Sequence, residues 1–131
     1  MMNKKIRELV WNKYNKHCAY CGCKIELKDM QVDHIKPIAR GQPPALRKMM
    51  GIEVGDDTIE NYNPSCRACN FRKGMLTIDE FREVIVKGMD ILEKNFTYRF
   101  MKKYHLLAEV FPREVEFFFE CVKRNKEFLN L

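Results

Sequence analysis

The chain of 131 residues carries 24 Lys and Arg against 18 Asp and Glu, a net charge of +6, and 46% of its residues are hydrophobic. These values are typical of a single globular domain, and a basic chain suits a polyanionic partner such as a nucleic acid. The opening stretch MMNKKIRELVWNKYNKHC has no continuous apolar run, and VEFFFECV is too short to span a bilayer. We therefore expect a cytoplasmic protein with no membrane partner.

The first predicted element is a helix over residues 4–16, because Ile6, Leu9 and Val10 recur at helical spacing. Residues 24–35 alternate loosely between apolar and polar, which predicts a β-hairpin with its turn in LKDMQ. A long loop is expected next, over residues rich in Pro and Gly, with a short helical turn in PALRKMMG. Loops of this length inside a compact domain are usually functional.

The second half of the chain is expected to be mostly helical. Thr77 and Glu80 form a capping-box pattern that predicts the start of a helix, and residues 98–108 predict a further helix. The stretch EVEFFFECV fits both a helix and a strand, and Pro112 together with its aromatic residues favours a strand.

Four of the six cysteines form two C-x2-C pairs, a pattern that predicts a tetrahedral zinc site. A cytoplasmic location disfavours disulfide bonds. Cys23 could replace the second cysteine of the first pair, but CAYCG has the better spacing, with Gly22 to relax the turn. Four thiolates leave no open position on the metal, so the zinc is expected to be structural. The predicted ligands are Cys18, Cys21, Cys66 and Cys69.

An acidic residue and an imidazole stand together between the two cysteine pairs, as Asp33 and His34 in VDHI. Together with CAYCG and DDTIENYNPSCRACNFRKG, this stretch resembles the HNH endonuclease family, whose site is a ββα-metal motif. The resemblance implies an α+β fold with a small, zinc-stabilised, treble-clef-like core and flanking helices. It also implies a single HNH nuclease domain over residues 1–131, with its core at about 14–77 and a helical or strand extension over 78–131.

The resemblance implies a role for each of four residues. His34 corresponds to the general base that takes a proton from the attacking water, and Asp33 to a ligand of a catalytic divalent metal. Asn61 corresponds to the asparagine that braces the long loop against the strand of the base. Asn70 stands where many members have the final histidine, the other ligand of the catalytic metal. An asparagine at this position is a departure from the literal motif, and it resembles the arrangement in phage Holliday-junction nucleases of the endonuclease VII type.

The residue types suit metal-assisted hydrolysis of a phosphodiester. Carboxylate and amide oxygens are ligands for Mg²⁺ or Mn²⁺, and imidazole is partly neutral near pH 7. Successive side chains of a strand face opposite sides, so the strand must end or bulge at Asp33 and His34 for both to reach one phosphate.

The expected partner is DNA. Basic residues flank the proposed site and can contact phosphates without reading sequence, although those beside the cysteines can equally neutralise the thiolates. A zinc module that binds nucleic acid without cutting it, and an interaction protein that docks through its aromatic C-terminal segment, are the alternatives. The residues expected to contact DNA are Lys36, Arg40, Arg67, Arg72 and Lys73.

Overall fold

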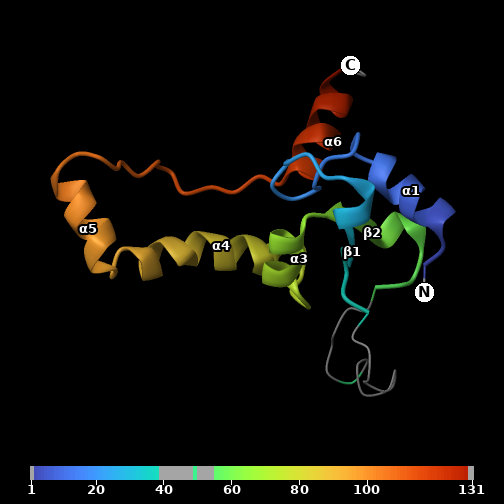
Figure 1. Cartoon of the computed structure of the whole chain (residues 1–131), viewed down its shortest axis with the longest axis horizontal. Coiled ribbons are helices and arrows are strands. Elements are labelled where there is room, and N and C mark those ends of the chain that lie inside the picture. Colours follow the sequence, from blue (N-terminus) through green and yellow to red (C-terminus); the bar gives the residue numbers. More distant parts are fainter. Residues whose placement is uncertain (1, 39–48, 50–54, 130–131) are drawn as a thin grey trace.

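The computed structural model describes residues 2–38, 49 and 55–129, with the side chains of 127–129 left out (Figure 1). It combines helices with a two-stranded sheet, which confirms the predicted α+β class. None of the helices in these ranges is long and apolar enough to cross a membrane. The main elements are α1 (Lys4–Asn12), β1 (Gln31–His34), β2 (Tyr62–Ser65), α3 (Arg67–Lys73), α4 (Ile78–Leu92), α5 (Phe96–Lys103) and α6 (Phe118–Leu129).

Helix α1 is shorter than the sequence predicted. The side chain of Asn3 caps its first turn by accepting a hydrogen bond from the Ile6 backbone N–H at 2.9 Å. The helix ends at Asn12 because Asn15 and Lys16 adopt positive φ angles of 53° and 68°, which are incompatible with a continuing right-handed helix. Its buried Val10 packs in a small core cluster. The other buried members of that cluster are Ile25, Met30 and Tyr62.

The sheet pairs segments that are distant in sequence, so the predicted hairpin over residues 24–35 is wrong. β1 pairs antiparallel with β2, with Asp33 opposite Asn63 and His34 opposite Tyr62. The segment before β1 instead forms a single bridge and a 3-10 turn, Leu27–Asp29. Loose alternation shows that a segment is extended, but it does not identify the strand with which that segment pairs.

Helix α3 follows β2 directly and completes a ββα unit. Cys66 caps the helix, with its sulfur accepting from the Cys69 backbone N–H. The helix packs against β1, and it ends at Gly74, whose φ is 48°. One face of α3 therefore lies against the strand that carries Asp33 and His34.

The predicted capping box is present at the start of α4. Thr77 accepts from the Glu80 backbone N–H at 3.2 Å, and the Glu80 carboxylate accepts from the Thr77 backbone N–H at 2.9 Å. Helix α5 covers only part of the predicted range 98–108 and ends at Lys103. His105 then takes a positive φ of 60°, which turns the chain back toward the core.

The predicted strand in EVEFFFECV is wrong. The chain is extended as far as Phe117, and α6 begins at Phe118, where Glu120 accepts from the Phe117 backbone N–H at 2.9 Å. The alternating aromatics do not reflect sheet pairing: Phe117 and Phe119 pack with Tyr20 of the first cysteine turn. Two backbone hydrogen bonds, from Phe118 to Tyr20 and from Phe119 to Ala19, fasten this segment to the turn.

We expect the Phe117 ring to carry much of the stability of this junction. It is 2% exposed, stacks on Phe81 at 5.1 Å and meets Tyr20 edge to face at 5.3 Å. Phe117→Ala should lower the free energy of unfolding by about 3–5 kcal/mol, measured by chemical denaturation. Phe71, which is 82% exposed, supplies the control, because Phe71→Ala should change stability little. Equal losses in the two variants would contradict the assignment of Phe117 to the core.

Candidate active site and metal centre

The structure brings the four predicted cysteines together. All four Sγ atoms lie within 4.8 Å of one another, and those of Cys21 and Cys66 are 3.9 Å apart. A tetrahedron of sulfurs at about 2.3 Å from a zinc ion has edges of about 3.8 Å, so the donor set fits zinc. Cys23 is exposed and lies outside this group, in agreement with the preference for Cys21.

Backbone N–H groups donate to two of the four sulfurs. The Tyr20 backbone N–H donates to the Cys18 sulfur at 3.4 Å, and the Cys69 N–H donates to the Cys66 sulfur at 3.5 Å. A hydrogen bond with the Cys69 side chain lowers the pKa of Cys18 to about 4, and the same hydrogen bond raises the pKa of Cys69. Gly22 has a φ of 80°, a conformation that lets the first cysteine turn close. Deprotonated sulfurs are the form that binds metal.

A buried ion pair holds the carboxylate of Asp33. Asp33 is 4% exposed and Lys73 is 1% exposed, and the ammonium lies 3.1 Å from Asp33 Oδ2. Lys73 also donates to the His34 carbonyl oxygen at 2.9 Å, and the Tyr20 hydroxyl donates to Asp33. Burial raises the pKa of Asp33, while the hydrogen bonds from Tyr20 and Lys73 act in the opposite direction.

This arrangement corrects the expectation that Lys73 contacts DNA. Its ammonium is enclosed and committed to Asp33 and to the β1 backbone, so it cannot meet a phosphate from this position. From the sequence alone, Lys73 is expected to be exposed, because most lysine side chains lie at the surface. The tertiary structure instead uses it to neutralise a buried acid.

His34 lies at the surface with two partners that sequence reasoning missed. Its side chain is 21% exposed, and its Nε2 lies 2.9 Å from Asp57 Oδ1. The Tyr62 hydroxyl donates to the same oxygen at 2.7 Å, and its ring meets the imidazole edge to face at 5.3 Å. One indication of this contact was present in the sequence: Asp57 lies in DDTIEN, which is part of the stretch that resembles the HNH motif.

Asp33, His34 and Asn70 line one pocket of about 540 Å³. β1 ends at His34. The side chains of Asp33 and His34 are therefore not forced to opposite sides, as they would be within a continuing strand, and both line the same pocket. Asn70 comes to the pocket from α3, one helical turn before Lys73. The pocket therefore contains three of the four residues expected at the site.

Asn61, the fourth residue, lies beside the pocket and ties together the two ends of the long loop. Its side chain accepts from the Lys36 N–H at 2.9 Å and donates to the carbonyl oxygens of Lys36 and Asp56 at 3.0 and 2.8 Å. Gly55 fits against the same place, since an added Cβ would lie 1.9 Å from the Lys36 carbonyl oxygen. These are the contacts that a brace of the loop requires.

The remaining basic candidates differ in their positions. Lys36 next to the pocket, and Arg67 and Arg72 on α3, are exposed. Arg40 lies outside the described residues.

Comparison with protein families agrees with this geometry. Residues 18–75 match the profile of the HNH endonucleases, a range that extends from the first cysteine turn to just beyond α3. A comparison with curated proteins gave no match.

We expect one tightly bound zinc ion per chain, coupled to folding, because the four sulfurs join the first turn to the start of α3. Cys66→Ser should lose both the zinc and the folded state, measured by elemental analysis and circular dichroism. Cys23→Ser is the matched control and should keep both. Folded wild-type protein without zinc would contradict this expectation.

Proposed function

We propose that the protein is a metal-dependent endonuclease that hydrolyses phosphodiester bonds in DNA, with His34 as the general base. The observation that supports this most directly is the convergence of Asp33, His34 and Asn70 on one pocket within the HNH segment. A module that only binds DNA has no need of an acid, an imidazole and an amide around a shared space.

The donor set of the pocket suits a hard divalent cation. Asp33 and Asn70 offer a carboxylate and an amide oxygen, the ligand types that Mg²⁺ and Mn²⁺ prefer. Each carboxylate oxygen has two acceptor positions, so the bonds from Tyr20 and Lys73 leave capacity for a further contact. A metal bound there would stabilise the negative charge that develops on the phosphate oxygens.

Side chains of the protein accept the proton of the attacking water and stabilise the charge that results. In the tautomer that donates Nε2–H to Asp57, the Nδ1 atom of His34 carries the lone pair that accepts a proton from the attacking water. The water oxygen bonds to phosphorus, the P–O bond to one sugar breaks, and the departing alkoxide takes a proton from solvent. The resulting imidazolium is stabilised by the adjacent Asp57 carboxylate.

Asp57 is proposed as a positioning residue for this base. It contacts His34 directly, and the Tyr62 hydroxyl holds the same carboxylate oxygen, so the ring is oriented from two sides. Partners of this kind fix the tautomer and the direction of an imidazole without touching the substrate.

DNA is proposed to approach over the exposed basic residues beside the pocket. Lys36, Arg67 and Arg72 can contact phosphates, which makes binding largely electrostatic and independent of sequence. The exposed cations lie on the segment after β1 and on α3, the two elements that flank the pocket.

Replacing His34 should separate cleavage from folding and binding. His34→Ala is expected to keep zinc and DNA affinity but to lose on the order of a hundredfold or more in cleavage rate, since a general base is removed. Nicking of supercoiled plasmid with Mg²⁺ or Mn²⁺ measures the rate, and His105→Ala is the control, because that exposed residue lies beyond α5. Equal activity in His34→Ala and wild type would remove His34 from the mechanism. No activity in either would favour a module that only binds DNA.

Asp57→Asn should lower kcat by roughly tenfold or more while leaving DNA affinity equal or tighter, because it weakens the hold on His34 and removes a negative charge. Asp57→Glu should recover part of the loss. The matched control is Asp56→Asn, which removes the same charge one residue away, where the carboxylate accepts from Thr58. Steady-state kinetics and binding assays make the comparison. A similar fall in both Asn variants would point to general electrostatics instead of positioning.

A further inference from the structure

Tyr20 connects the zinc-binding turn to the proposed ligand of the catalytic metal. It lies within the first cysteine turn and is 3% exposed. Its ring is held by edge-to-face contacts with Phe117 at 5.3 Å and with Phe81 at 5.6 Å. Its hydroxyl donates a hydrogen bond to Asp33 Oδ2. The placement of the Asp33 carboxylate therefore depends on a residue of the zinc turn.

Asn63 determines the direction in which this hydroxyl donates. Asn63 is fully buried on β2, opposite Asp33 in the sheet register, and its Nδ2 donates to the Tyr20 hydroxyl oxygen at 3.4 Å. A hydroxyl has a single proton, so an oxygen that accepts from Asn63 keeps its own proton for Asp33. The three side chains form a chain of hydrogen bonds from β2 through the zinc turn to β1.

The two carboxylate oxygens of Asp33 differ in the donors that they meet. Oδ2 accepts from Tyr20 and lies 3.1 Å from the Lys73 ammonium, so each of its two acceptor positions has a partner. Oδ1 accepts from Lys73 at 3.3 Å, and no other donor among the described residues contacts it. Because Asp33 lines the pocket, Oδ1 keeps one acceptor position for a cation bound there.

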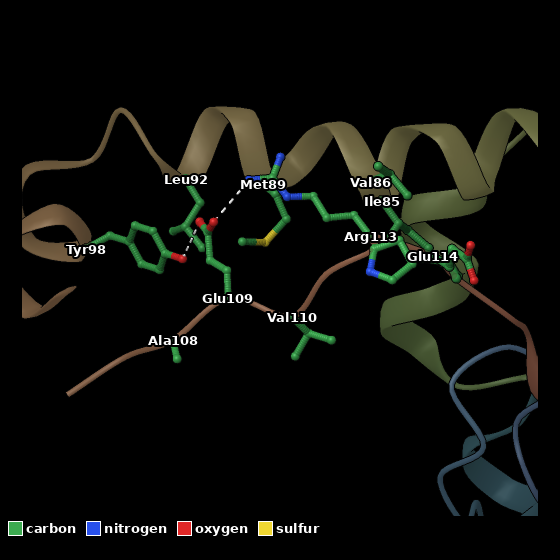
Figure 2. Close-up of a pocket in the computed structure, with 12 residues that line it drawn as sticks. Ile85, Val86, Met89, Leu92, Tyr98, Ala108, Glu109, Val110, Arg113 and Glu114 are labelled. Atoms are coloured by element: carbon green, nitrogen blue, oxygen red, sulfur yellow. Dashed lines mark hydrogen bonds and ion pairs between the residues drawn. The ribbon is translucent and has the colours of Figure 1, made fainter. Parts of the chain in front are cut away.

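Glu109, after α5, is a shielded carboxylate with a tyrosine donor of its own, and its surroundings differ (Figure 2). The Tyr98 hydroxyl donates to Glu109 Oε1 at 2.8 Å, and Lys102 lies 3.5 Å from the same oxygen. Arg113 donates to Oε2 at 3.1 Å. Two separate cations thus neutralise Glu109, whereas Asp33 shares one ammonium between its two oxygens. Asp33 is the carboxylate that retains capacity for a further cation.

We propose that Tyr20 is a positioning residue for the catalytic metal, because its hydroxyl occupies Asp33 Oδ2 and leaves Oδ1 to bind the divalent cation. This role rests on the metal site of the proposed endonuclease, and it identifies the donor atom of that site. Tyr20 acts through Asp33 and touches neither the substrate nor the metal. The four sulfurs that close the turn around Tyr20 thereby also orient a ligand of the second metal.

Tyr20→Phe tests this role, because it removes the hydroxyl and keeps the ring that packs in the core. In the zinc-loaded full chain, the dissociation constant for Mn²⁺ should rise roughly tenfold or more, measured from the electron paramagnetic resonance of the free ion. Zinc content and circular dichroism should match the wild type. In plasmid nicking, the Mn²⁺ concentration that gives half the maximal rate should rise by a similar factor, while kcat at saturating Mn²⁺ changes less.

Tyr98→Phe is the matched control, since it deletes a hydroxyl that donates to Glu109 and should leave the affinity for Mn²⁺ unchanged. Asp33→Asn identifies the pocket site, because Mn²⁺ that this variant still binds lies elsewhere. A measurement on the wild type makes the test independent of how the variants fold. In proton NMR of chains labelled at tyrosine, saturating Mg²⁺ should shift the Tyr20 hydroxyl signal and leave the Tyr98 signals in place.

Equal affinity for Mn²⁺ in Tyr20→Phe and wild type would overturn the role of Tyr20. The same conclusion would follow from an equal loss in Tyr98→Phe, from a wild type without Mn²⁺ in the pocket, or from a Tyr20 signal that Mg²⁺ leaves in place. Failure of the endonuclease function has a different result: Tyr20→Phe weakens the binding of Mn²⁺, but the wild type nicks no plasmid.

Discussion

The convergence of four cysteine sulfurs determines how the rest of this small core is arranged. Two antiparallel strands of four residues each are too little to be stable in water on their own. The sulfurs join the turn at residues 18–21 to the first turn of α3, so the segment that contains β1 and β2 is closed at both ends. The Ala19 backbone N–H adds a hydrogen bond to the Pro64 carbonyl oxygen at 2.8 Å. With α3 held there, its side chains reach the underside of β1.

The candidate site depends on that placement of α3. Asn70 and Lys73 are three residues apart and therefore lie on the same face of the helix. Asn70 contributes to the pocket, while Lys73 neutralises Asp33 and donates to the β1 backbone. A carboxylate with 4% exposure is costly to keep ionised without such a partner. One helix thus supplies a proposed metal ligand and also the cation that makes the buried acid tolerable.

The core and the arm, which is the projection made of α4, α5 and the returning segment 106–117, are stabilised by different means. In the core, aromatic rings from the cysteine turn, from α4 and from the segment before α6 pack into one cluster, and α6 returns to close it. The arm relies on ion pairs around Arg113 and exposes its apolar side chains. Asp90 is largely exposed, so its pair with Arg113 contributes little, whereas the Glu109 side chain is only 5% exposed and its pair with Arg113 is the better shielded of the two.

Local features of the sequence determined the parts of the molecule that depend on spacing along the chain. The C-x2-C spacing predicted each of the two cysteine turns, and Thr77 with Glu80 predicted the start of α4, because each of these features depends on residues only three positions apart. The meeting of the two turns in one cluster is a long-range contact. The VDHI stretch and its flanking motifs indicated the HNH endonucleases, whose family model matches residues 18–75. The sequence also indicated an α+β class.

Tertiary structure alone decided which distant segments meet. β1 pairs with β2 instead of with the preceding residues, Lys73 turns inward to Asp33, and Asp57 reaches His34 across the long loop. The aromatics of EVEFFFECV alternate because they pack on Tyr20, which no strand pattern could reveal. Each of these contacts joins residues far apart in sequence. Pairing, burial and partner choice depend on how the whole chain packs, whereas caps and cysteine turns depend only on adjacent residues.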